Sequence, residues 1–216
     1  MIKVRKCEEY LEVLGKREPG LFRLPASNLS QDDIQQIEQT LGYTFPEQYK
    51  EFLASRQIPD VCKVYITLCG KSSRFWDTFS REENKYVQRE TNDVQVDLNW
   101  YGINGACAMD WIDHLKTLVG DMYIWVDAGY IRLGDFHKED YFIFYDLLTG
   151  SVLKIHNGDI DENELFWDAL DSEDPNAIRV AMKKTASGFC EDFNSFLRLV
   201  CEGGVYDEDR MIFCNL

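Results

Sequence analysis

The densest group of chemically active side chains in this 216-residue sequence is an acidic run in its second half. No Lys or Arg occurs between Lys154 and Arg179, and eight carboxylates lie there: Asp159, Asp161, Glu162, Glu164, Asp168, Asp171, Glu173 and Asp174. Carboxylates at this density can bind a cation or attract a basic protein, and they repel phosphate groups. Because unpaired charges are costly to bury, we expect the first four of them to share one exposed surface.

A calcium site is a natural first hypothesis for this run, because Asp159-x-Asp161-x-Asn163 begins like an EF-hand loop. That loop needs Gly at its sixth position and a bidentate Glu at its twelfth. Glu164 and Leu170 stand there instead. The spacing therefore argues against calcium binding.

A second group, His137, Glu139 and Asp140, lies in the segment GDFHKEDY. An imidazole beside two carboxylates could bind a metal or transfer protons, but the segment is also typical of a solvated hairpin loop, which we favour. His114 is expected to pack or to cap a helix, and His156, which ends a strand near Asp159, is expected to be structural. The sequence contains no GxGxxG, GxxxxGK[ST], GxSxG or HExxH motif. We therefore expect no catalytic site and no cofactor.

The seven cysteines are odd in number, and no two of them form a CxxC pair. This pattern argues against a disulfide scaffold and against a zinc site built on paired thiolates. Buried, reduced cysteines in a cytosolic protein are the simpler interpretation.

The net charge of −15 is unevenly distributed, with −2 in residues 1–108 and −13 in residues 109–216. Such a surface disfavours nucleic acid and anionic membranes and would attract a basic partner protein, although acidity for solubility alone stays open. No apolar run approaches the length of about 20 residues that spans a bilayer. Glu8, Glu9 and Glu12 interrupt what would be the apolar region of a signal peptide, so we predict a cytoplasmic protein.

The elements that must position these side chains can be predicted from periodicity. Apolar spacing predicts helices over residues 3–14, from Ser30 to Leu41, and from Pro46 onward, with Ser30 as N-cap, Asp33 in the capping-box position and Gly42 as C-cap. Leu41 and Phe52 are expected to be core anchors. A strand is predicted over 61–68 and a short helix over 109–119, while residues 71–99 give no clear pattern.

Four further strands are predicted over 122–126, 130–133, 141–145 and 152–156, the last two joined by a turn at Gly150. Helices are predicted over 164–170, 176–185 and 188–201. Helices, then antiparallel strands, then helices is the order of an α+β fold. We therefore predict a single domain with a twisted antiparallel sheet flanked by N-terminal and C-terminal helices.

The order of three motifs resembles the SUKH superfamily. The segment LPASNLSQDDIQQIEQTLGYTFPEQYKEFL is similar to its N-terminal motif, at the positions Ile34, Glu38, Leu41, Gly42, Pro46, Tyr49, Phe52 and Leu53. GDFHKEDYFIFYDLLTGSVLKIHNGD resembles its central hairpin, at Gly134, Asp135, Tyr141, Asp146, Gly150 and Val152. ASGFCEDFNSFLRLV resembles its closing helix, with Phe193, Phe196 and Leu197 facing inward.

This resemblance implies one SUKH-like domain over residues 1–216, with a helical extension over about 1–25 and an enlarged middle over about 59–123. The superfamily includes bacterial immunity proteins and yeast regulators of cell-wall glucan assembly. It therefore implies a non-enzymatic protein-binding module: an immunity protein that neutralises a toxin such as a nuclease, or alternatively a regulatory scaffold. We expect the toxin to be basic and to contact Asp159, Asp161, Glu162, Glu164, Asp168 and Asp171. A metal-binding protein or enzyme using His137, Glu139 and Asp140 is the remote alternative.

Overall fold

The computed structural model describes residues 6–18, 24–58, 60–69, 77–80, 85–88, 93–118, 124–136 and 141–214. Within these ranges the helices are α1 (Cys7–Arg17), α2 (Gln31–Leu41), α3 (Glu47–Ser55), α4 (Ala108–Leu118), α5 (Ile124–Asp127), α6 (Asn157–Asp161), α7 (Glu164–Asp171), α8 (Pro175–Thr185) and α9 (Phe193–Glu202). The strands are β1 (Val61–Cys69), β2 (Asp77–Ser80), β3 (Lys85–Gln88), β4 (Asp93–Tyr101), β5 (Tyr130–Phe136), β6 (Tyr141–Asp146), β7 (Val152–His156), β8 (Ser187–Cys190), β9 (Val205–Asp207) and β10 (Ile212–Phe213).

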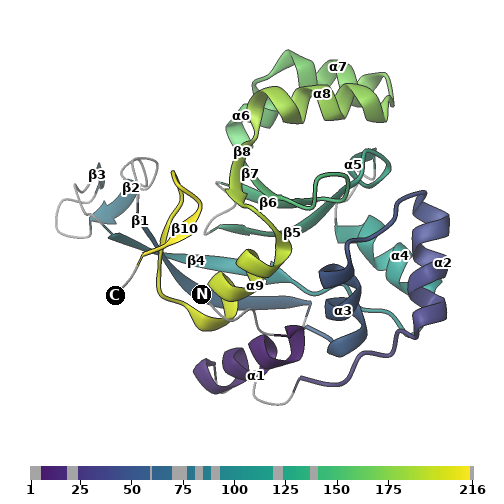
Figure 1. Cartoon of the computed structure of the whole chain (residues 1–216). Coiled ribbons are helices and arrows are strands. Elements are labelled where there is room, and N and C mark those ends of the chain that lie inside the picture. The colour runs from purple at the N-terminus through teal and green to yellow at the C-terminus, as the bar shows by residue number, and fades with distance from the viewer. Residues whose placement is uncertain are drawn as a thin grey trace.

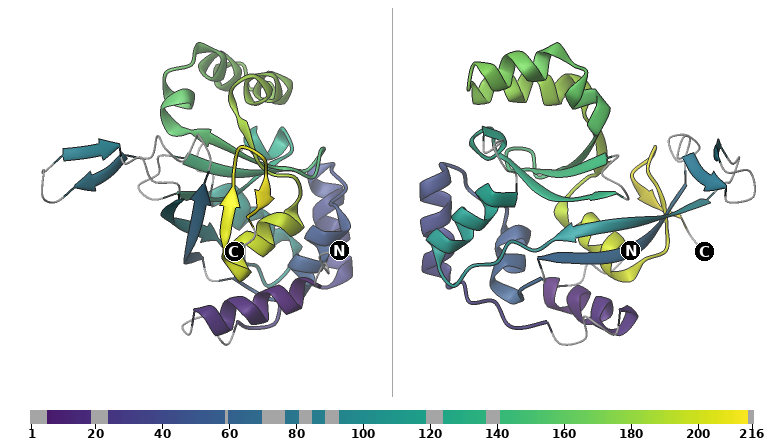
Figure 2. Two further views of the ribbon diagram at one scale, coloured as in Figure 1. Left: turned by 60° about the vertical axis from the view of Figure 1, so that its left-hand side comes forward. Right: turned by 180° about the vertical axis from the view of Figure 1, so that it is seen from behind.

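Eight of the strands form one curled sheet in the order β10-β9-β1-β4-β5-β6-β7-β8 (Figure 1). Neighbouring strands of this sheet pair antiparallel, with the exception of β1 and β9, which run parallel. The strands β2 and β3 form a separate hairpin beyond the end of β1 (Figure 2). The predicted α+β class is confirmed.

The sheet separates two hydrophobic clusters. The larger cluster lies between the sheet and the helices α1, α2, α3, α4 and α9, and the smaller one lies between β5–β7 and the helices α5, α7 and α8 (Figure 1). The near-continuous apolar run of β6 follows from this arrangement. Ile143 and Tyr145 enter the larger cluster, and Phe142 and Phe144 enter the smaller one. A strand covered on both faces needs apolar residues at every position.

The N-terminal motif folds largely as predicted. Ser30 and Asp33 form a reciprocal capping box, and Gly42 ends α2 with a φ of 75°. Pro46 stands at the N-cap of α3, one position before the first turn predicted for it. Leu41 is half-buried at the edge of the larger cluster and is not the central anchor that we predicted, because Ile34 and Ile37 occupy the middle of the buried stripe of α2.

Two predicted elements are wrong. The predicted strand over 122–126 contains a helical turn, α5, which directs Trp125 into the smaller cluster and Val126 into the larger one before Gly129 ends the turn at a φ of 81°. The predicted helix over 188–201 begins only at Phe193, because Asp192 caps it through the backbone N–H of Ser195. Residues 187–190 instead pair with β7 as an edge strand.

Four strands of the sheet were not predicted. The largest is β4, which pairs with β1 along nine residues and begins within the segment that gave no clear pattern. The other three, β8, β9 and β10, are two to four residues long. Such short strands are defined by their neighbours more than by their own residues.

Candidate partner-binding surface

The acidic run folds as three short helices, α6 to α8, which we call the acidic lobe (residues 157–185). Each helix begins at a side chain that accepts a backbone N–H. His156 Nδ1 accepts from Gly158, Asn163 Oδ1 from Leu165, and Asp174 Oδ1 from Asn176. The carboxylate of Asp174 therefore has a local structural role, whereas the carboxylates of the other seven acids cap none of these three helices.

Aromatic stacking holds the acidic lobe on the sheet. The ring of Trp125 lies between Phe144 and Phe166, with ring centroids 5.0 and 5.5 Å away. From α8, Arg179 donates to the carboxylate of Asp146 at 3.1–3.3 Å and to the Ala128 carbonyl at 2.8 Å. The lobe is thus fixed by a buried apolar surface and one charged anchor.

All eight carboxylates of the run are exposed: Asp159, Asp161, Glu162, Glu164, Asp168, Asp171, Glu173 and Asp174. Asp159, Glu162, Glu164 and Asp168 line one shallow hollow together with Gly158, Asn163 and Leu165. Asp161 and Asp171 do not line it. The structure therefore brings four of the six predicted contact residues around a single depression.

No Lys or Arg within the described ranges forms an ion pair with a carboxylate of this hollow. The ion pairs formed among the described residues all use carboxylates outside the acidic run. The basic residues that flank the run along the chain, Lys154 and Arg179, pair instead with Glu208 and Asp146. An unpaired cluster of like charges on a water-exposed surface gives a local negative potential.

Two exposed apolar side chains lie on the same helix as some of these carboxylates, and neither was predicted from the sequence as part of the surface. Trp167 is 52% exposed and Leu165 39% exposed, and the indole Nε1 of Trp167 donates to the Asp161 carbonyl at 2.8 Å. That hydrogen bond fixes the ring at the surface beside the carboxylates. The helical periodicity of the sequence indicates this exposure, because Phe166 and Ala169 define the buried side of α7 and leave Leu165 and Trp167 outside it.

The N-terminal motif residues serve the fold. Glu38 accepts the backbone N–H of Phe45 at 2.5 Å and pairs with Lys50 at 3.0 Å, which joins α2 to α3. Tyr49, Phe52 and Leu53 are buried in the larger cluster. None of these side chains is available to a partner.

The central hairpin motif is also structural. Gly134 lies so close to β4 that an added Cβ would overlap the Asn99 carbonyl oxygen. The adjacent Asp135 is fully buried, and its carboxylate accepts from Asn99 Nδ2, Tyr101 Oη and Arg132 Nη2. Tyr141 packs edge-on against Phe136 and His156, and Gly150 adopts a φ of 75° in the turn between β6 and β7.

The structure gives no support to the alternative catalytic and metal-binding groups among the described residues. His137, Glu139 and Asp140 lie outside the described residues. His114 contacts the backbone of Asn104 at 3.0 Å through Nδ1, and His156 caps α6. Asp159 and Asp161 lie in a helix, which is incompatible with an EF-hand loop.

The raised pKa values of four buried thiols keep them mainly in the protonated form near neutral pH. Burial raises the pKa of Cys7 and of Cys62 to about 12, and it raises the pKa of Cys190 and Cys201 above the ordinary thiol value. A catalytic cysteine needs the opposite shift, because the thiolate is the nucleophile.

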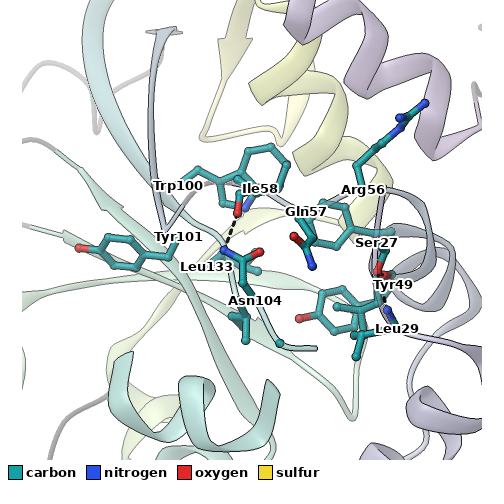
Figure 3. A pocket seen from close by; sticks show the side chains of 14 residues that line it. Ser27, Leu29, Tyr49, Arg56, Gln57, Ile58, Trp100, Tyr101, Asn104 and Leu133 are labelled. Carbon is teal, nitrogen blue, oxygen red and sulfur yellow. Dashed lines mark hydrogen bonds between the residues drawn. The ribbon is translucent and has the colours of Figure 1, made fainter. Parts of the chain in front are cut away.

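A cavity between α3 and β4 is lined mainly by apolar residues that include Tyr49, Ile58 and Trp100 (Figure 3). The Asn104 amide crosses it to donate to the Ile58 carbonyl at 2.8 Å, and Figure 3 shows this hydrogen bond. The volume of about 20 Å³ is close to the space that one water molecule occupies. This cavity is therefore too small for a substrate or an organic cofactor.

Comparison with known proteins gives one family. The model of the SMI1 / KNR4 family (SUKH-1) matches residues 28–199, which is more than half of the chain. No curated protein and no solved structure matches it. None of the helices in the described part of the chain combines the length and apolarity that a bilayer crossing requires.

Proposed function

The chain belongs to the SMI1 / KNR4 family (SUKH-1), and we propose that it acts without catalysis, as an immunity protein that neutralises a basic toxin through the acidic lobe. The observation that carries this proposal is the hollow lined by Asp159, Glu162, Glu164 and Asp168, which no cation of the described residues pairs. A toxin that holds phosphates, such as a nuclease, presents Lys and Arg at its active site. The lobe offers carboxylates that would occupy such a site in place of the nucleic acid.

Charge and shape support different parts of this proposal. Exposed carboxylates accelerate the encounter with a basic protein and contribute less to the lifetime of the complex. The lifetime needs buried contact area, which Trp167 and Leu165 supply beside the charges. Tryptophan is enriched among the residues that dominate binding energy in protein interfaces.

The electrostatic part is tested by charge reversal in two matched variants. One variant carries Glu162→Lys, Glu164→Lys and Asp168→Lys, and the control carries Glu12→Lys, Glu47→Lys and Glu51→Lys. The control residues are exposed on α1 and α3, on the other side of the sheet (Figure 1). Both variants change the net charge equally, so a difference between them reports the location of the interface.

Association with the product of a neighbouring toxin gene is then followed by stopped flow at two salt concentrations. The lobe variant should associate at least about tenfold more slowly at low salt, and the difference should shrink as the Debye length falls from about 10 Å at 0.1 M to about 3 Å at 1 M. If both variants slow association equally, net charge alone acts and the lobe is not the interface. If neither slows it, binding uses another surface.

The contact part is tested by Trp167→Ala. We expect faster dissociation by about 30-fold or more with little change in association, as for a residue at the centre of an interface. Val180→Ala is the matched control, because Val180 is also about half exposed but lies on α8, away from the residues of the hollow. Equal and small effects of both substitutions would contradict a role for Trp167.

A further inference from the structure

Two thiols and a carboxylate that are far apart in the sequence meet at the edge of the sheet. Cys69 ends β1, Asp207 ends β9 and Cys214 follows β10. One ligand atom from each of the three lies within 4.8 Å of the other two, and the two sulfurs are 3.3 Å apart. No other three Cys, His, Asp or Glu side chains converge this closely in the part of the chain that the structure describes.

The strand register explains why these side chains meet. Cys69 is paired with Asp207 across β1 and β9, and Cys214 donates its backbone N–H to Val205 across β9 and β10. Val205 and Asp207 are two residues apart, so their side chains lie on the same face of the sheet. The cluster therefore has one thiol at the end of β1, the other directly after β10, and a carboxylate at the end of β9 between them.

We propose that Cys69, Asp207 and Cys214 form a Zn²⁺ site that joins the last two strands to β1. Two thiolates and one carboxylate are a ligand set that zinc accepts, with water or another ligand in the fourth position. Zinc–sulfur bonds of about 2.3 Å in a tetrahedron place two sulfurs about 3.8 Å apart. The observed 3.3 Å differs from that separation by about half an ångström, so small side-chain movements complete the site.

The separation of the sulfurs fits an ion better than a disulfide. The 3.3 Å between them is about 1.3 Å longer than a disulfide bond of about 2.05 Å and lies closer to the separation of about 3.8 Å in a zinc dithiolate. An ion between the two thiolates also uses the carboxylate of Asp207, which a disulfide would not. Asp207 also accepts the backbone N–H of Arg210 at 3.1 Å through Oδ1, which orients the carboxylate, while the side chain of Arg210 is 76% exposed and competes weakly.

The test uses the full chain, purified under reducing conditions and stripped of metal with a chelator. Titration with Zn²⁺ should give one bound equivalent, and titration with Co²⁺ should give the charge-transfer absorption of thiolate–cobalt bonds. Cys69→Ser and Cys214→Ser should each abolish this absorption, and Asp207→Asn should weaken Zn²⁺ binding by about tenfold or more. Cys107→Ser is the matched control, because Cys107 is an exposed cysteine outside the cluster.

A second readout does not depend on the variants. Zn²⁺ at a hundredfold excess over its Kd should raise the Tm of the unmodified chain by about 5–10 °C, and a chelator should reverse the shift. The proposal is overturned if the unmodified chain binds no stoichiometric metal, or if Cys107→Ser loses the cobalt signal as fully as Cys69→Ser does. It is also overturned if reduced chain exposed to an organic disulfide forms a Cys69–Cys214 bond that metal neither prevents nor slows. None of these outcomes bears on the toxin-binding proposal.

Discussion

The buried carboxylates of the sheet and the exposed carboxylates of the acidic lobe lie in opposite environments. Asp135 and Asp146 are buried, and each is held by an Arg together with further donors. Glu208 is buried against Lys154, and burial raises its pKa although Lys154 opposes part of that rise. In the lobe, Asp159, Glu162, Glu164 and Asp168 are exposed around one hollow.

This contrast separates two uses of the same side chain. A buried carboxylate that has its partners contributes to the fold and is not available to a second molecule. An exposed carboxylate without an internal partner contributes little to the fold and can exchange its hydration for a partner protein. The following four predictions test that separation, from the largest expected effect on stability to the smallest.

Asp135→Ala should lower the free energy of unfolding by about 3–5 kcal/mol, because it leaves the guanidinium of Arg132 partly buried without its carboxylate. Urea unfolding followed by tryptophan fluorescence measures the loss. A change below about 1 kcal/mol would show that the buried carboxylates are not the structural ones.

The Lys154–Glu208 pair should show strong coupling. Lys154→Met alone should lower the free energy of unfolding by about 3 kcal/mol, since it leaves the Glu208 carboxylate buried without a cation. Adding Glu208→Leu should recover most of the loss, because a well-packed apolar pair can replace a buried ion pair. A double-mutant cycle in urea gives the coupling energy, and additive losses would contradict the prediction.

Ser30→Ala should lower the free energy of unfolding by about 1 kcal/mol, the usual value for a lost helix N-cap. Hydrogen bonds from Ser30 and from the Ala108 backbone lower the pKa of Asp33 below its ordinary value. A lowered carboxyl pKa stabilises the fold above the unfolded value of about 3.9 and loses that contribution as pH falls through the folded pKa. Asp33→Asn should therefore flatten the stability profile below about pH 4, and an unchanged profile would contradict this.

Replacing Asp159, Glu162, Glu164 and Asp168 by the corresponding amides should change the free energy of unfolding by less than about 0.5 kcal/mol. The fourfold variant removes like charges from an exposed surface and breaks no ion pair of the described residues. Urea unfolding at low and at high salt measures the change. A large loss of stability would mean that the lobe carboxylates support the fold, which would remove the contrast with Asp135.

Long periodic segments were predictable from the sequence, and elements fixed by distant contacts were not. The capping box at Ser30, the alternation of β1 and the stripe of α8 are local signals, and each element formed as expected. β4 carried an equally clear alternation at Val96, Leu98 and Trp100, which was hidden by the charged, turn-rich residues that precede it. The turn at α5 was mistaken for a strand because Ile124, Trp125 and Val126 are typical strand residues.

The two candidate sites also combine features that could be predicted from the sequence with features that could not. The exposure of the acidic run could be predicted, because burying eight carboxylates without basic residues is prohibitively costly. The hollow could not, since it lies where α6 meets α7, and both helices are placed by side chains, Ile160 and Phe166, that pack in the smaller cluster. The convergence of Cys69 with Cys214 could not be predicted either, because 145 residues separate them and three strands must pair before they meet.

The parallel pairing of β1 with β9 has a consequence for how the protein is made. Thr67 pairs with Val205, so one edge of β1 stays open until nearly 140 further residues have been translated. At about 5–20 residues per second, that delay is roughly 7–28 s. During this interval the nascent chain carries an unpaired strand edge and lacks α9, the helix against which α1 packs. The interval between the synthesis of β1 and that of β9 is therefore the period in which the growing chain exposes this strand edge, and the pairing of β9 and β10 completes the sheet.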